Sequence, residues 1–332
     1  MAVKNIIDEI EQDVADVFKT NFVYNDTKIV PNSDDGSLTY ERGAEKKGKK
    51  LCTSVLYVDI RNSVALTEKH QSLTMGKIYT AFIKAVLKVA RYHDGHTRNI
   101  IGDRVMVVFP EDNCFTNAVD CAISINHISK YVIRKQFPGV DFNCGIGIDY
   151  GDLRIIKVGI QRNGTERAEN KGLVWAGYPA NIASRLTDNA NKTIEETYFE
   201  VIMNPINPLA LRPAFRPLSS LLGNNLKYDP KSPFYLTTTK TVEMSPEEFS
   251  NSIAQYTNGG LFMTGGNLLS FSKKIRKTTY PPILMTEVVY NGFKKTNNTR
   301  NCIVNNFWKE QKHEIKNVST KIYGGDVHWS LQ

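Results

Sequence analysis

The stretch from Leu51 to Ala65 constrains the fold of this chain more than any other. Residues 54–58 are mostly β-branched, aromatic or aliphatic and include neither Gly nor Pro, which is typical of a buried central strand. Asp59 follows immediately, and a charge at that position is costly unless it is paired or bound to a metal. Residues 61–63 then form a plausible helix start, where free N–H groups bind anions. We therefore expect a site for a metal ion and a triphosphate at Asp59.

Composition excludes several classes of protein. The chain has 332 residues, 41% hydrophobic and 23% charged, as in a soluble globular protein with one large or two ordinary domains. No apolar run reaches the length of a membrane span, and the start of the chain is too acidic for a signal peptide. Five cysteines without a CxxC pair predict reduced thiols and a cytoplasmic location. The net charge of +8 is compatible with nucleic acid, a membrane surface or a polyanionic small molecule. Because no stretch interleaves basic and aromatic residues, a phosphate-bearing small ligand is at least as well supported as a polymer. We expect neither a nucleic-acid nor a membrane partner.

The order of the expected elements indicates the fold class. After the strand ending at Asp59, the patterns predict a helix at about 76–92, a hairpin over 96–109 that turns at Gly102-Asp103, a helix over about 113–136, a strand pair turning at Tyr150-Gly151-Asp152, and a helix beginning near Pro179. The order β-α-β-β-α-β predicts an α/β (α+β) protein with a ferredoxin-like split βαβ core.

Three segments are expected along the chain. Residues 1–50 form an amphipathic N-terminal helix over 1–20 and a polar lead-in. Residues 51–240 form the central domain. Residues 241–332 form a mixed C-terminal extension or small second domain, whose role the sequence leaves open, a sensory role included.

Asp103 is the second candidate metal ligand. In a split βαβ sheet the first strand lies in the middle, beside the hairpin, so Asp59 and Asp103 can reach one point. Two neighbouring carboxylates repel each other unless a cation lies between them, and hard oxygen ligands suit Mg²⁺ or Mn²⁺. Two such ions between carboxylates are typical of nucleotidyl and phosphoryl transfer. The alternative is that Asp103 is only a turn residue.

Asn181 and Arg185 form a third candidate feature. They are separated by one helical turn and share a helix face. An amide can orient a ribose, and a guanidinium can grip a phosphate and stabilise a pentavalent transition state. The alternative is an ordinary surface Asn and a solvated Arg.

Three sequence runs together resemble the class III nucleotidyl cyclases. They are Tyr57-Val-Asp59-Ile-Arg-Asn-Ser, Ile101-Gly102-Asp103-Arg-Val-Met-Val-Val-Phe109 and Gly177-Tyr-Pro-Ala-Asn181-Ile-Ala-Ser-Arg185-Leu. The resemblance covers roughly residues 50–200.

The resemblance implies a role for each matching residue. It implies that Asp59 and Asp103 bind two metal ions with help from the Ile60 carbonyl, and that Asn181 and Arg185 stabilise the transition state. It also implies that backbone N–H groups near Asn62, Ser63 and Val64 cradle the phosphates. In the family, one site takes its metal pair and its Asn/Arg pair from different subunits, so a head-to-tail homodimer with two shared sites is implied.

The departures from the family pattern concern the base. The Lys and Asp that read purines in the family are replaced by Asn99 and Val174. Tyr57 precedes Asp59 by two residues, faces the same way on a strand and would shrink the base pocket. The Asn99 amide can both donate and accept, as a uracil edge requires.

These departures resemble the pyrimidine cyclases of Pycsar antiphage systems, which make cyclic UMP or cyclic CMP as a signal for a separate effector. We therefore expect UTP as the substrate. The alternatives are a cytidylate cyclase using CTP, an adenylate cyclase with unusual base contacts, and an inactive nucleotide-binding regulatory module.

Overall fold

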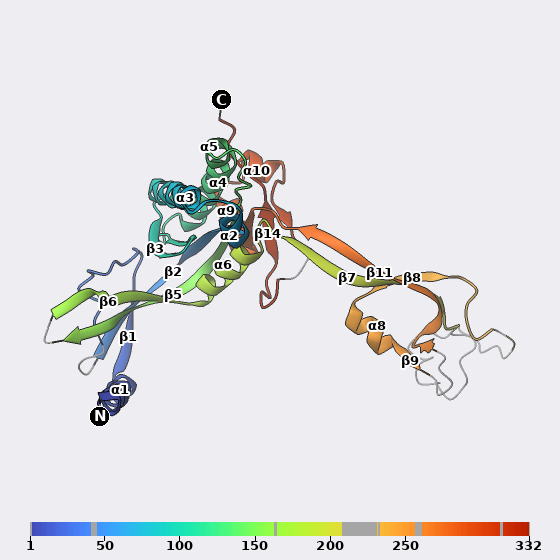
Figure 1. Ribbon diagram of the computed structural model, residues 1–332, viewed down its shortest axis with the longest axis horizontal. Helices are drawn as coiled ribbons and strands as arrows, with labels where there is room; N and C mark the ends of the chain where they lie inside the picture. The colour runs from blue at the N-terminus through green and yellow to red at the C-terminus, as the bar shows by residue number, and fades with distance from the viewer. Residues whose placement is uncertain are drawn as a thin grey trace. The chain divides into compact units, whose positions relative to one another are not determined.

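The chain folds into two compact units, one inserted into the other. The computed structural model describes residues 2–40, 45–162, 165–207, 231, 233–255, 261–312 and 315–331. The first unit comprises Met1–Lys192 and Tyr280–Gln332, and the second comprises Thr193–Thr279 (Figure 1). The chain leaves the first unit after Lys192 and returns at Tyr280, whose N–H donates to the Lys192 carbonyl over 3.0 Å. The second unit is therefore an insertion.

The first unit combines helices with one large sheet. Its helices are α1 (Ala2–Lys19), α2 (Ser63–Lys69), α3 (Ser72–Tyr92), α4 (Cys114–Ile128), the π-helical turn η1 (Ser129–Ile133), α5 (Arg134–Gln136), α6 (Tyr178–Asn189), α9 (Glu287–Thr296) and α10 (Asn301–Val304). Its strands are β1 (Asn21–Asp26), β2 (Glu45–Ile60), β3 (His96–Ile101), β4 (Arg104–Val108), β5 (Cys144–Arg162), β6 (Thr165–Ala176), β12 (Ile283–Thr286), β13 (Lys309–Glu310) and β14 (Ile322–Gly325). No helix in the described part of the chain is both long and apolar enough to cross a membrane.

The strand order confirms the predicted ferredoxin-like core. The sheet runs β13-β14-β12-β5-β2-β4-β3, with β1 paired to β2 and β6 paired to β5. Within the segment β5-β2-β4-β3, β2 lies between two antiparallel neighbours, and β3 and β4 form the predicted hairpin. Gly102 occupies the turn with a φ of +63°, a left-handed conformation that glycine adopts without strain.

Side chains of β2 divide between two hydrophobic cores, one on each face of the sheet. Leu56 and Val58 pack with α2, α3, α4 and α9 on one face. Val55 and the half-buried Tyr57 pack on the opposite face, together with α6. Because alternate residues of a strand face opposite ways, Asp59 lies on the same face as Tyr57, towards α6.

The hairpin predicted at Tyr150-Gly151-Asp152 is wrong, because β5 runs through these residues without a turn. Residues 144–155 of β5 pair continuously with residues 49–60 of β2. The dipeptide Gly-Asp is typical of turns. Here the chain stays extended, because the long antiparallel pairing with β2 satisfies its backbone hydrogen bonds.

The C-terminal residues belong to the first unit rather than to a separate extension over 241–332. Strand β12 pairs in parallel with β5, and Ile283 and Met285 lie in the core beneath α3 and α4. The predicted boundary at residue 240 instead falls inside the inserted unit. The boundary differs because a sheet can recruit strands from distant parts of a chain, which local composition does not reveal.

The inserted unit is built on a second sheet. Its elements are β7 (Thr193–Pro205), β8 (Lys240–Met244), α8 (Pro246–Ser252), β9 (Ile253–Gln255), β10 (Leu261–Met263) and β11 (Gly266–Thr279), and the strand order is β8-β7-β11-β10-β9. Its small core contains Val201, Phe249 and Met263. Two basic residues of β11 are paired with acidic partners: Lys274 with Glu200 over 2.5 Å, and Lys277 with Glu195 over 2.6 Å.

Candidate active site

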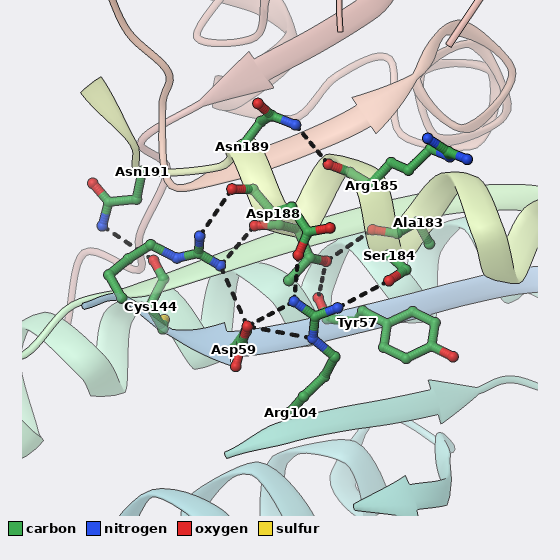
Figure 2. A network of polar contacts seen from close by, with 12 residues as sticks. Tyr57, Asp59, Arg104, Cys144, Ala183, Ser184, Arg185, Asp188, Asn189 and Asn191 are labelled. Carbon is green, nitrogen blue, oxygen red and sulfur yellow. Dashed lines mark hydrogen bonds and ion pairs between the residues drawn. The ribbon is translucent and has the colours of Figure 1, made fainter. Parts of the chain in front are cut away.

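Asp59 lies at the carboxyl end of β2 and is held by the arginine that follows the second predicted metal ligand. Arg104 donates to Oδ2 of Asp59 from Nε over 3.3 Å and from Nη2 over 2.8 Å (Figure 2). The side chains are 28% and 19% exposed respectively, so this ion pair is partly shielded from water. A charge-assisted contact of this kind fixes the orientation of the carboxylate.

The same arginine joins the strand to α6. Arg104 also donates from Nη1 to the Ser184 hydroxyl over 3.0 Å and forms an ion pair with Asp188. Arg61 donates to the backbone carbonyls of Thr187 over 2.7 Å and Asp188 over 3.1 Å. Cations near the last carbonyls of a helix satisfy groups that have no partner within the helix. Two arginines therefore anchor the last turn of α6 beside Asp59.

A glycine on β5 allows this close approach. A Cβ at Gly147 would lie 2.2 Å from the Ala183 carbonyl, so no other residue fits there without a shift of α6. The Thr187 hydroxyl, also on α6, donates to the Tyr57 carbonyl over 3.1 Å. The helix is thus fixed directly over the end of β2.

Asp103 lies close to Asp59, as the sequence predicted. The pKa of Asp103 is raised, first by burial and second by the negative charge of Asp59, while its own backbone N–H and the Ser63 hydroxyl oppose the rise. Its Oδ2 is buried and has no hydrogen-bond partner among the described residues. Two adjacent carboxylates with one unsatisfied oxygen have the chemistry of a divalent cation site.

The residues present fit a cation that also binds substrate. No group of three or more His, Cys, Asp or Glu side chains able to hold a metal occurs in the described ranges. Mg²⁺ commonly binds through one or two carboxylates plus substrate phosphates, and Asp59 with Asp103 match that pattern. Ile60 has a side chain buried in the core, so only its backbone carbonyl could contribute.

The turn after β2 leads into α2 beside these carboxylates. Asn62 has a left-handed φ of 53° and makes no side-chain cap to α2. Val64 is 73% exposed, and Ser63 and Val64 line a shallow hollow together with Tyr79. The first N–H groups of α2 are therefore left without a capping side chain.

Two of the predicted base-contacting positions lie in one row of the sheet. Tyr57 and Asn99 each pair with Met106 on β4, from β2 and β3 respectively, so the three residues cross the sheet on one face. Burial raises the pKa of the Tyr57 hydroxyl. Val174 on β6 pairs instead with Ile156 and is 42% exposed.

Asn181 and Arg185 lie on the exposed face of α6. Neither side chain makes a hydrogen bond or ion pair with Asp59 or Asp103 within the described part of the chain, and Figure 2 shows the Arg185 side chain pointing away from Asp59. A single chain therefore brings together Asp59, Asp103 and Ser63 but leaves the Asn/Arg pair outside that group.

Sequence reasoning did not identify Arg104, Asp188 or the contacts of Arg61. The position of Arg104 gave a signal, because a residue that directly follows a candidate metal ligand at the start of a strand is well placed to orient its neighbours. Asp188 gave none, because only the packing of α6 on β5 brings it to Arg104.

No protein-family model matches the chain. Its sequence is similar to a curated uridylate cyclase from Burkholderia cepacia, with 29% identity over 56% of this chain and 79% of that protein. It is also similar to a uridylate cyclase from a Rhodovulum strain, with 24% identity over 55% of this chain and 75% of that protein. A cytidylate cyclase from Staphylococcus aureus is 32% identical over 33% of this chain and 28% of that protein.

Similar solved structures are also cyclases. An adenylyl cyclase from P. aeruginosa aligns with a TM-score of 0.43 and 13% identity, over 83% of this chain and 94% of that chain. A guanylyl cyclase domain from Blastocladiella emersonii aligns with a TM-score of 0.40 and 12% identity, over 82% of this chain and 94% of that chain.

Proposed function

We propose that this protein, whose predicted resemblance to nucleotidyl cyclases is confirmed by its curated relatives, converts UTP to 3′,5′-cyclic UMP and pyrophosphate. The single observation that carries the reaction is the adjacent pair Asp59 and Asp103, with a buried Oδ2 on Asp103 that lacks a partner. Such a pair needs a cation, and a cation bound by only two carboxylates has room for a triphosphate.

Two divalent cations, Mg²⁺ or Mn²⁺, would be held by Asp59, Asp103 and the Ile60 carbonyl, and would activate the ribose 3′-hydroxyl while neutralising the triphosphate. The chain itself supplies positioning and charge. The backbone N–H groups of Asn62, Ser63 and Val64, at the start of α2, donate to phosphate oxygens. Asn181 orients the ribose, and Arg185 stabilises the charge that develops on the α-phosphate.

We propose a head-to-tail homodimer with two shared sites. The exposed positions of Asn181 and Arg185 support this arrangement, because neither residue contacts Asp59 or Asp103 of its own chain. A second subunit would bring its α6 to the first subunit's carboxylates and complete the site. Each dimer would then hold two equivalent sites, as a two-fold symmetric assembly requires.

The residues at the base positions favour a pyrimidine. Tyr57 occupies the face that carries Asp59, so its ring limits the size of a base bound there. Val174 has no hydrogen-bonding side chain, and Asn99 can satisfy a uracil edge by donating and accepting. CTP is the second candidate, because one curated relative is a cytidylate cyclase.

We place the enzyme in bacterial antiphage defence, where cyclic UMP acts on a separate effector protein. The similarity to the Pycsar pyrimidine cyclases supports this role. The five cysteines are all free thiols, which supports a reducing compartment such as the cytoplasm.

The test is incubation of the purified protein with each of the four ribonucleoside triphosphates and Mn²⁺, with products identified by mass. Cyclic UMP is the expected main product. Asp59→Ala should abolish it, whereas Asp13→Ala, an exposed change on α1, should not. Cyclic AMP alone would disprove the pyrimidine assignment, and no product from any nucleotide would favour a regulatory module.

A further inference from the structure

A β-bulge places an arginine beside the position where the purine-reading lysine is absent. On β3, Thr97 pairs with Val107 and Asn99 pairs with Met106, so Arg98 is an extra residue between them. A bulge of this kind re-aims a side chain that would otherwise alternate to the other face. Arg98 therefore joins Asn99 on the face that carries Tyr57 and Met106.

The surroundings of Arg98 leave its donors largely unused. Its guanidinium carbon lies 5.6 Å from the centre of the Trp175 ring, and Nη2 reaches only the Val30 carbonyl at 3.5 Å. Its Nε is buried without a hydrogen-bond partner, and no carboxylate of the described residues lies within ion-pair distance. Burial lowers the pKa of this guanidinium. A half-buried cation without an anionic partner is costly unless a ligand supplies acceptors.

Trp175 places Arg98 on the face of the sheet that carries Tyr57. It follows Val174 directly on β6 and packs against the same hydrophobic cluster as Tyr57 and Met106. The contact between Arg98 and Trp175 therefore joins side chains of β3 and β6 on one face of the sheet. Asn99 lies directly beside Arg98, whereas Val174 precedes Trp175 on β6 and faces the opposite side of the sheet.

We propose that Arg98 selects uracil over cytosine by donating to the O4 carbonyl, a role that rests on the proposed cyclase function. A guanidinium can only donate hydrogen bonds. Uracil carries a carbonyl on each side of its N3–H, so it offers Arg98 an acceptor while the Asn99 amide oxygen accepts the N3–H. Cytosine carries an amino group at the fourth position. This amino group is itself a donor, so it would face the Arg98 guanidinium without forming a hydrogen bond. The Asn99 amide can rotate to hydrogen-bond either base, so Arg98, which only donates, decides between uracil and cytosine.

The opposing explanation is structural: Arg98 only holds β3 against the Trp175 ring. A structural role would lower stability and reduce activity with both nucleotides equally. A specificity role changes the ratio of the two kcat/KM values. Arg154, whose guanidinium lies 5.8 Å from the Tyr24 ring in the same unit, makes a similar contact away from the base positions and provides a matched control.

The experiment measures kcat/KM for UTP and CTP with Mn²⁺ in the full chain, Arg98→Gln and Arg154→Gln. Arg98→Gln should lower the UTP-to-CTP ratio about tenfold or more, because a charge-assisted hydrogen bond to uracil is lost. Arg154→Gln should leave the ratio unchanged. If circular dichroism shows Arg98→Gln unfolded, Arg98→Lys decides the question, since it keeps the charge and loses the planar fork, and it should lower the ratio by a smaller factor.

An unchanged ratio in the folded Arg98 variant would overturn the role of Arg98 and leave the cyclase function standing. A wild-type protein that prefers CTP would also overturn the role of Arg98 and leave the cyclase function standing. A wild-type protein that forms no cyclic pyrimidine nucleotide would overturn both.

Discussion

Arg104 donates two hydrogen bonds to Oδ2 of Asp59 and, with the same guanidinium, forms an ion pair with Asp188 on α6. One side chain thus connects a candidate metal ligand to the helix that carries Asn181 and Arg185. Both hydrogen bonds from Arg104 go to Oδ2, so this arginine leaves Oδ1 of Asp59 uncontacted. Residues that hydrogen-bond to a metal ligand fix its orientation, and they commonly govern metal affinity and activity.

Replacing Arg104 with methionine should therefore weaken both the fold and the site. Asp59 would keep only its longer 3.9 Å ion pair with Arg61, and Asp188 would lose its ion pair with Arg104, so we expect a loss of about 2 kcal/mol in the free energy of unfolding. Cyclase activity should fall by about tenfold or more. Urea denaturation and initial rates with Mn²⁺ measure the two effects. Lys130→Met, which breaks the Lys130–Asp326 ion pair elsewhere in the unit, should retain activity; full activity in Arg104→Met would contradict the orienting role.

Asp103→Asn should stabilise the metal-free protein while abolishing its activity. The folded state raises the pKa of Asp103, so its contribution to stability is present at low pH and is lost as pH rises through the folded-state pKa. Removing the charge should raise Tm by about 1–3 °C in EDTA at pH 8, with a smaller gain at pH 5. Differential scanning fluorimetry measures both. A lower Tm at pH 8 would show that Asp59 and Asp103 do not repel.

Mixing two inactive variants tests the shared sites. Asp59→Ala and Arg185→Ala should each be inactive alone. After subunit exchange, half of the dimers combine one of each, and each such dimer holds one intact site, so roughly a quarter of the wild-type rate should return. Steady-state rates before and after mixing measure the recovery. No recovery, despite exchange shown by size-exclusion of differently tagged subunits, would indicate sites made within one chain.

Asp149 predicts a second pH dependence, unrelated to catalysis. Its side chain accepts from the Thr286 hydroxyl over 2.6 Å, while its Oδ2 is buried without a partner among the described residues. Burial raises the pKa of Asp149 to about 6. Stability should therefore fall as pH rises from about 4 to 6, by up to about 3 kcal/mol.

Asp149→Asn should remove this slope and gain about 1 kcal/mol at pH 7.5, because its amide N–H₂ replaces a charge but lacks an acceptor. Urea denaturation across pH measures the slope, and an unchanged slope would contradict the assignment.

The insertion predicts two opposite results of deletion. Replacing residues 194–278 with a short Gly-Ser turn should leave the first unit folded, because Tyr280 N–H already meets the Lys192 carbonyl. Ending the chain after Thr279 should prevent folding, because β12 and the core residues Val289 and Phe293 would be lost. Circular dichroism and thermal melting compare the two chains. A folded truncated chain would contradict the placement of β12.

The sequence by itself determined the features that depend on neighbouring residues. A strand ending on Asp59, a tight turn at Gly102-Asp103 and the spacing of Asn181 from Arg185 each follow from local patterns, and together they indicated the core and the site. These patterns work because side-chain alternation and helical spacing fix which residues share a face.

Only the tertiary structure decided features that join distant segments. The long pairing of β2 with β5 removed the turn expected at Gly151, and the parallel pairing of β12 with β5 moved the last part of the chain into the first unit. Arg104 meets Asp188 only because α6 packs on the sheet, and Arg98 meets Trp175 only because β6 joins the same sheet by pairing with β5. Contacts between residues far apart in the sequence depend on the packing of whole elements, which no local pattern encodes.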